Sequence, residues 1–328
     1  MLDTLSDLDQ ALLDRFQRDL PLVSQPYAAI AASLGRTEAE VLARLRSLAD
    51  RGMITRVGAT VRPNTVGAST LAALAVPEAQ IETVADIVGA EPGVNHSYLR
   101  EHVWNLWFVA TAPDRERLAQ SLERIAVNTG LEVLDLPLLK AFNIDLGFSL
   151  KGDARATPQP ANIDPEALRP ADRPIVQAMT EGLPLIPLPF AAIAAALGRS
   201  ESDIIARIEA LQTAGILTRI GVIVRHRAIG WKSNAMVVWD VPEDRIDIAG
   251  PVLARHPGVT LCYQRPRIEG LWPFSLFSMI HAQSREAALE TLRAASALPE
   301  LAGCTHQVLF SVKCFKQQGA LVHQEAAE

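Results

Sequence analysis

The sequence predicts an α+β fold built as a tandem duplication, in which each unit is a winged helix-turn-helix followed by a ferredoxin-like βαββαβ domain. The first observation behind this prediction is an internal repeat. Sixteen of the thirty-one positions from Ala28 to Gly58 recur unchanged 163 residues later, without a gap. The second observation is helical periodicity at the start of each copy. The third is an alternation of short strands and helices over the rest of each copy.

The repeat also sets the domain boundaries. Between the copies the sequence is rich in proline and small residues, which is typical of a linker. We expect a first winged helix-turn-helix at residues 1–66, a first ferredoxin-like domain at 67–150, a linker at 151–170, a second winged helix-turn-helix at 171–231, a second ferredoxin-like domain at 232–318 and a tail at 319–328.

Three helices open each unit. Ser6, with an acid three residues later, is a capping-box start, and Thr37 begins another helix in the same way. Gly35 is a natural stop for the helix between them. A short strand pair at Ile54–Val61, with its counterpart at Leu217–Val224, completes each winged helix-turn-helix.

The ferredoxin-like part follows in the order strand, helix, hairpin, helix, strand. In the first copy we place these elements at Thr70–Val76, Glu78–Val88, Val94–Arg100 with Val103–Thr111, Asp114–Val127 and Leu131–Leu139. The second copy repeats the order from Ala235 to Val312. We expect the two units to pair through these sheets and to hold a site between them, because one sheet face offers no large concavity.

Composition excludes several classes of protein. The chain has 328 residues, of which 49% are apolar and 21% charged, and its formal net charge is −6. This excludes intrinsic disorder, and the absence of a long apolar run excludes a membrane-spanning helix. The N-terminus lacks the features of a signal peptide, and the three cysteines lack metal-binding spacing, so we expect a cytoplasmic protein.

The helical part has the residue pattern of a DNA-binding helix-turn-helix, but it lacks the positive charge that such a unit needs where it meets DNA. The exit of the third helix, with Arg44, Leu45, Leu48 and Gly52 before Met-Ile, resembles the Lrp/AsnC family of transcriptional regulators. The first turns of the recognition helices are acidic, at Thr37–Glu40 and at the corresponding place in the second copy. Phosphate contacts supply most of the affinity for DNA, so these acids argue against binding.

The hairpin of each ferredoxin-like domain carries polar residues on one face. Alternation along a strand places His96, Tyr98 and Arg100 together, and likewise Tyr263 and Arg265. With the Asn-Leu-Trp-Phe and Trp-Pro-Phe-Ser runs that follow, these hairpins resemble the sirohaem (siroheme) decarboxylases, a family with the Lrp/AsnC fold. The likeness covers about residues 5–317, and the two halves resemble fused D-type and L-type subunits.

The resemblance implies loss of the acetate carboxyl groups at C12 and C18 of sirohaem, giving 12,18-didecarboxysirohaem. It implies no redox or organic cofactor, and no metal of the protein's own, because the iron belongs to the substrate. The tetrapyrrole is the expected partner, without DNA or membrane. The two units would form a pseudo-dimer within the chain, and a further homodimer is left open.

The same resemblance suggests site residues. A histidine acid near neutrality would protonate the substrate, and arginines would hold its carboxylates. The candidate catalytic residues are His96, His102 and Arg100. The candidate substrate-binding residues are Tyr98, Trp104, Trp107, Tyr263, Arg265, Arg267, Trp272, Phe274, Lys140 and Lys313. His96 or His102 is alternatively an axial ligand to the substrate iron.

Several alternatives remain open on the sequence alone. The counterpart of His96 in the second copy is Leu261, which suggests one proton-donating half and one mainly binding half. His226 fits a turn residue, with contact to the substrate as the alternative, and His281 fits a structural residue. The functional alternative is a transcriptional regulator that senses haem or another tetrapyrrole. The order of the two decarboxylations, the number of active sites, and haem d1 or haem as end product are not specified.

Overall fold

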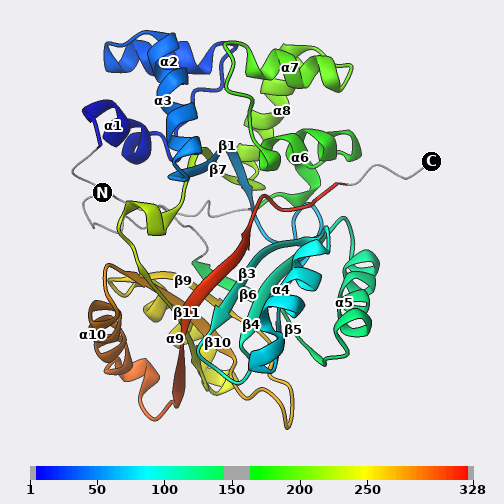
Figure 1. Ribbon diagram of the computed structural model, residues 1–328, viewed down its shortest axis with the longest axis vertical. Coiled ribbons are helices and arrows are strands. Elements are labelled where there is room, and N and C mark those ends of the chain that lie inside the picture. The colour runs from blue at the N-terminus through cyan, green and yellow to red at the C-terminus, as the bar shows by residue number, and fades with distance from the viewer. Residues whose placement is uncertain (1–4, 144–162, 324–328) are drawn as a thin grey trace.

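The computed structural model describes residues 5–143 and 163–323. Helices of both units form one body, and a large sheet with helices on its outer side forms a second body below it in Figure 1. The helical body contains α1 (Asp7–Arg15), α2 (Pro26–Leu34), α3 (Glu38–Asp50), α6 (Arg173–Glu181), α7 (Pro189–Ala196) and α8 (Glu201–Thr213).

The helix boundaries follow the predicted capping signals. The Ser6 side chain accepts from the backbone of Asp9, and Thr37 forms the same capping box with Glu40. Gly35 ends α2 with a φ of 62°, a conformation that favours glycine. The apolar faces of these helices share a single hydrophobic core with those of α6, α7 and α8. The two helix-turn-helix regions therefore form one packed body.

The strands that follow the recognition helices differ from the prediction. We expected a strand pair within each wing, but each range forms one strand, and β1 (Ile54–Val61) pairs antiparallel with β7 (Leu217–Val224). Gly58 lies opposite Gly221 in this ladder, and a Cβ at either position would clash with backbone of the other unit. The repeated glycines thus permit a close approach between the two units. Each wing supplies one strand of the two-stranded sheet that they form together.

The sheet body contains two ferredoxin-like halves. The first consists of β2 (Ala68–Leu74), α4 (Ile81–Ala90), β3 (Val94–Arg100), β4 (Leu106–Ala112), α5 (Arg115–Thr129) and β5 (Val133–Pro137). The second consists of β8 (Ser233–Trp239), α9 (Ile246–Arg255), β9 (Val259–Gln264), β10 (Leu276–Ala282), α10 (Arg285–Ser296) and β11 (His306–Gln317). Short 3₁₀ turns lie at Glu78–Gln80, Pro165–Ala167, Pro170–Asp172, His226–Ile229, Glu243–Arg245 and Pro299–Leu301.

The two halves join into one sheet by exchanging strands. Its order is β5-β2-β4-β3-β11-β8-β10-β9-β6, so the units pair through their sheets as expected. The long β11 pairs with β8 of its own unit and then with β3 of the other. In the first unit the expected strand at 131–139 corresponds to β5, and a further short strand that was not predicted, β6 (Lys140–Asn143), follows it and pairs with β9. Since β5 and β6 lie at opposite ends of the order, the sheet curves back toward itself.

The segments between and after the units are only partly described. Residues 151–162 of the expected linker lie outside the described residues, whereas 165–167 and 170–172 form 3₁₀ turns. Residues 319–323 of the expected tail run against α6. There Thr180 donates to the Ala320 carbonyl, and the Val322 amide donates to Gln177. The end of the described chain therefore ties the sheet to the helical body.

Candidate functional site

A cavity of about 410 Å³ lies between the helical body and the curved sheet, and both units line it. Its charged lining is of one sign. Among the described residues it has five arginines and three histidines, and no aspartate, glutamate or lysine. These residues are Arg56, Arg62, Arg100, Arg219, Arg265, His96, His226 and His281. Because the whole chain has a net charge of −6, this cationic lining is not a consequence of composition. The cavity suits a ligand that carries several negative charges.

Strand alternation brings the predicted pairs into this cavity. His96, Tyr98 and Arg100 come from β3. At the equivalent positions of the second unit, Tyr263 lies on β9 and Arg265 directly follows it. Each guanidinium lies over the tyrosine two residues earlier, at 5.6 Å from the ring centroid for Arg100 and 4.8 Å for Arg265. Cation–π contact fixes these long side chains before any ligand arrives.

The buried arginines retain unused donors. Arg100 donates to the Asn234 side chain at 3.1 Å and to the Leu309 carbonyl at 3.0 Å, and Arg265 donates to the Leu136 carbonyl. Within the described residues, the buried Nε atoms of Arg56, Arg100 and Arg265 have no hydrogen-bond partner. Burial lowers the pKa of Arg56 and of Arg100 to about 10. A carboxylate beside them would supply both the missing acceptor and the missing countercharge.

The three histidines gather on one side of the cavity. The rings of His226 and His281 lie edge to face, with centroids 4.8 Å apart. His281 Nε2 is 2.9 Å from the Asn234 amide nitrogen, and its Nδ1 is 2.7 Å from the Thr260 hydroxyl. Asn234 also contacts Arg100, so one polar network joins this guanidinium to the imidazoles.

All three imidazoles are held neutral in the absence of a ligand. Burial, followed by the positive charge of Arg56, lowers the pKa of His96 to about 4. Burial and the neighbouring Arg227 lower the pKa of His226 to about 4, with a smaller contribution from His96. Burial also lowers the pKa of His281. Histidines poised in this way would gain protons when negative charge enters the cavity.

Seven predicted residues do not line the cavity. His102 lies in the turn after β3, where Nε2 contacts the Gln307 side chain at 2.8 Å and Nδ1 accepts from the Trp104 amide. Trp104, Trp272 and Phe274 are buried in an apolar cluster on which the cavity-lining Trp107 also packs. These three rings therefore pack behind the residues that line the cavity and do not form its surface.

The remaining predicted cations are neutralised within the protein. Arg267 forms an ion pair with Asp240 at 2.6 Å. Lys140 and Lys313, expected at equivalent places on the last strands, pair with acidic side chains of α9 and α4 at 2.6 and 2.8 Å. None of the three points into the cavity lining. That they bind substrate carboxylates stays a prediction.

Part of the cavity lining lies outside the set of site residues that the sequence predicted. His226 and His281 were interpreted as turn and structural residues, and Arg56, Arg219 and Asn234 were not singled out. One available signal was the repeat itself. The first copy has proline where the second has His226, and threonine where it has His281, so both histidines are departures from the duplicated pattern.

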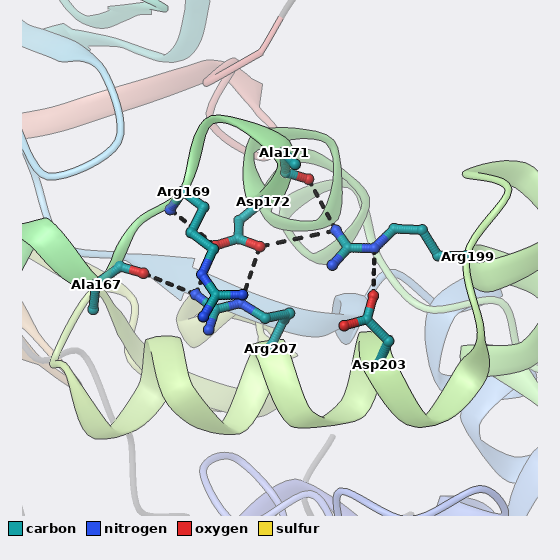
Figure 2. Close-up of polar contacts among 7 residues, drawn as sticks. All are labelled: Ala167, Arg169, Ala171, Asp172, Arg199, Asp203 and Arg207. Carbon is teal, nitrogen blue, oxygen red and sulfur yellow. Dashed lines mark hydrogen bonds and ion pairs between the residues drawn. The ribbon is translucent and has the colours of Figure 1, made fainter.

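The recognition helices hold their arginines in structural ion pairs. On α8, Arg207 donates to both oxygens of the fully buried Asp172, at 3.1 and 2.7 Å (Figure 2). Burial alone would raise the pKa of Asp172, but the bonds from Arg207 and the Arg169 amide lower it overall. In the first unit, Arg44 makes the corresponding pair with Asp9. These two guanidiniums are therefore engaged in holding the helices together.

Two negative findings concern the described residues. Within 5–143 and 163–323, no helix is long and apolar enough to cross a membrane. The same part of the chain contains no group of three or more His, Cys, Asp or Glu side chains suited to a metal ion.

Comparisons with known proteins match both kinds of domain. The family model for the AsnC-like ligand binding domain matches residues 66–143 and 228–316. The model for the "Siroheme decarboxylase NirDL-like HTH domain" matches residues 9–54 and 172–217. The chain is 60% identical over 325 residues to the "Siroheme decarboxylase NirDL subunit" of Paracoccus pantotrophus, which covers 99% of this chain and 100% of that protein.

Solved structures are similar over nearly the whole chain. A crystal structure of the sirohaem decarboxylase NirDL aligns with a TM-score of 0.69 and 28% identity, covering 98% of this chain and 95% of that one. A second, in complex with an iron-uroporphyrin III analogue, aligns with a TM-score of 0.66 and 29% identity, covering 93% and 91%.

Proposed function

This chain belongs to the sirohaem decarboxylase family of the NirDL type, and from that premise we propose that it removes the acetate carboxyl groups at C12 and C18 of sirohaem. The products would be 12,18-didecarboxysirohaem and two molecules of carbon dioxide. The observation that carries the proposal is the cavity, whose described lining residues include five arginines and no acidic side chain. The fused arrangement of the two units supports haem d1 synthesis as the destination of the product.

The chemistry needs a proton donor and no net oxidant. A proton added to the pyrrole carbon lets the ring accept the electron pair that is released when the bond to the carboxylate carbon breaks. Carbon dioxide leaves, the exocyclic carbon takes up a proton to become a methyl group, and the ring carbon gives its proton back. One proton is consumed per acetate, and electrons balance without a redox partner. We therefore propose that no organic or redox cofactor takes part.

We assign the roles to residues that line the cavity. His96 is the proposed general acid, because it lies beside Tyr98 in the cavity lining, where an entering substrate carboxylate would favour its protonated form. Arg100 and Arg265 are the proposed carboxylate anchors, since each has a buried Nε that lacks a partner in the described chain. His226 is a second proton carrier in this proposal.

The test is anaerobic incubation of the purified protein with sirohaem, followed by mass spectrometry of the tetrapyrrole. We expect the loss of two carboxyl groups. His96→Gln should bind sirohaem, as followed by absorption, but decarboxylate it at least 100-fold more slowly, which is the usual range for a missing general acid. The matched control is His256→Gln, at a half-buried position outside the cavity. Tight binding with an unchanged tetrapyrrole mass would refute the proposal.

A further variant separates the two candidate acids. His102 was a sequence candidate, but it contacts Gln307 and Trp104 rather than the cavity. If the general acid has to line the cavity, His102→Gln will retain most of the decarboxylase activity that His96→Gln loses. The reverse result would move the acid to the turn after β3.

We also propose that the helical body does not bind DNA. Its recognition helices begin with acidic residues, and Arg44 and Arg207 are engaged with buried aspartates. Fluorescence anisotropy with duplex DNA at low salt, with and without sirohaem, should show no saturable binding. Salt-sensitive binding that responds to the tetrapyrrole would favour a regulator.

A further inference from the structure

The two units give the cavity equivalent positions on both sides. Strands β3 and β9 align at an offset of 165 residues, which superposes Tyr98 on Tyr263 and Arg100 on Arg265. The pairing of β2 with β4 likewise matches that of β8 with β10. Residues that bind carboxylates and stack on rings are thus present twice, once in each unit.

The imidazoles are present only once. The positions equivalent to His96, His226 and His281 hold Leu261, Pro63 and Thr111, and all six residues line the same cavity. Thr111 faces Ser69 in its strand pair, as His281 faces Asn234 in the other. The outline of a second centre therefore exists, but the residues that stand there cannot donate a proton at neutral pH.

The three histidines belong to a single centre because a continuous set of contacts joins them. His96 lies against Tyr98, with ring centroids 6.5 Å apart, and the Arg100 guanidinium lies 5.6 Å from the same tyrosine ring. From Arg100 the contacts continue through Asn234 to the imidazoles of the second unit. Each unit supplies part of this centre, and among the described lining residues the three histidines all belong to it.

We infer that this one centre decarboxylates both acetates, and that the singly decarboxylated tetrapyrrole leaves the protein and rebinds with its other face forward between the two steps. The inference rests on the proposed function. The C12 and C18 acetates lie on neighbouring pyrrole rings and exchange places when the macrocycle is turned over about the axis through the C15 bridge and the iron. In any one pose only one of them reaches the imidazoles.

The cavity itself explains why release is required. A flat macrocycle cannot turn over within about 410 Å³ between the sheet and the helical body, whereas the partly open cavity lets it leave. After turning over outside, it meets the same arginine and tyrosine pairs, because the two units repeat them. Because the arginine and tyrosine pairs occur in both units, the tetrapyrrole can bind in either orientation. Because the histidines occur on one side only, it has to bind in both orientations to lose both carboxyl groups.

An isotope chase tests this inference with the full-length protein. The protein is loaded anaerobically with ⁵⁷Fe-sirohaem and mixed with a large excess of natural-abundance monodecarboxylated sirohaem, purified from a partial reaction. We expect the ⁵⁷Fe label to enter the free monodecarboxylated pool, with less than a tenth of it reaching the doubly decarboxylated product in the first turnover. Label that passes undiluted to the final product would overturn the inference.

Variants give an independent readout. His96→Gln and His226→Gln are each assayed from sirohaem and from the monodecarboxylated compound, so that the two losses are timed separately. One centre predicts that each variant slows both losses by the same factor. A variant that stops after one loss would require a second acid and would overturn the inference. A wild-type protein that removes no carboxyl group would instead refute the proposed function.

Discussion

Ligand binding in the cavity is expected to draw a proton from solution onto His96. With a pKa of about 4, only about one imidazole in a thousand is protonated at pH 7. A substrate carboxylate about 4 Å away, at the effective dielectric of such a site, stabilises the imidazolium by about 4 kcal/mol. This corresponds to about three tenfold steps in the protonation equilibrium, so about half of the bound protein would carry the proton at pH 7.

Calorimetry measures this uptake directly. An iron uroporphyrin is titrated into the protein at pH 7 in buffers of different ionisation enthalpy, and the slope of binding heat against that enthalpy counts the protons taken up. We expect about half a proton more for the wild type than for His96→Gln, because His226 and His281 can add to the uptake in both proteins. Binding heats that do not depend on the buffer would show that the imidazole stays neutral. The proposed acid would then have no source of its proton.

Three further predictions concern stability and affinity. His226 has a folded-state pKa below its ordinary value, so the unfolded chain binds its proton first and stability falls as pH drops from about 6.5 to 4. Urea unfolding should show that His226→Gln removes about 3 kcal/mol or less of this dependence. Asp172→Asn should destabilise by about 3–5 kcal/mol because Arg207 is buried, and Asp9→Asn by less because Arg44 is 36% exposed. Equal losses in urea would contradict this. Arg265→Gln should weaken iron-uroporphyrin binding about 10- to 150-fold, as one lost charged hydrogen bond implies, and an unchanged Kd would remove it as an anchor.

The fold was largely predictable because it depends on local patterns. The internal repeat fixed the duplication, and Ser6, Thr37 and Gly35 act at the helix ends as their residue types predict. The α+β class and the family resemblance are confirmed. In contrast, the alternation of polar and apolar residues along a strand does not show which other strand it pairs with. The pairing of β1 with β7 and the crossing of β6 to β9 depend on tertiary packing, and neither was predicted.

The site was only half predictable for a similar reason. Alternation placed His96, Tyr98 and Arg100 on one face, and the structure puts all three in the cavity. It could not tell which aromatic residues would face the cavity and which would pack behind it, as Trp272 does. His226 reaches the site from a 3₁₀ turn, where no strand or helix period predicts a direction.

The exchange of end strands has a consequence for how such a chain can evolve. The first copy has already crossed to the second at β6, before the residues that join them, and β11 makes the return crossing. Each copy is therefore completed by its neighbour, and the pairing would be the same if two genes encoded the halves. Fusion into one chain fixes the ratio of the two halves at one to one. Each half then always pairs with the other half and not with a copy of itself. Under that condition a duplicated protein can discard a functional group from one half without losing it from the assembly.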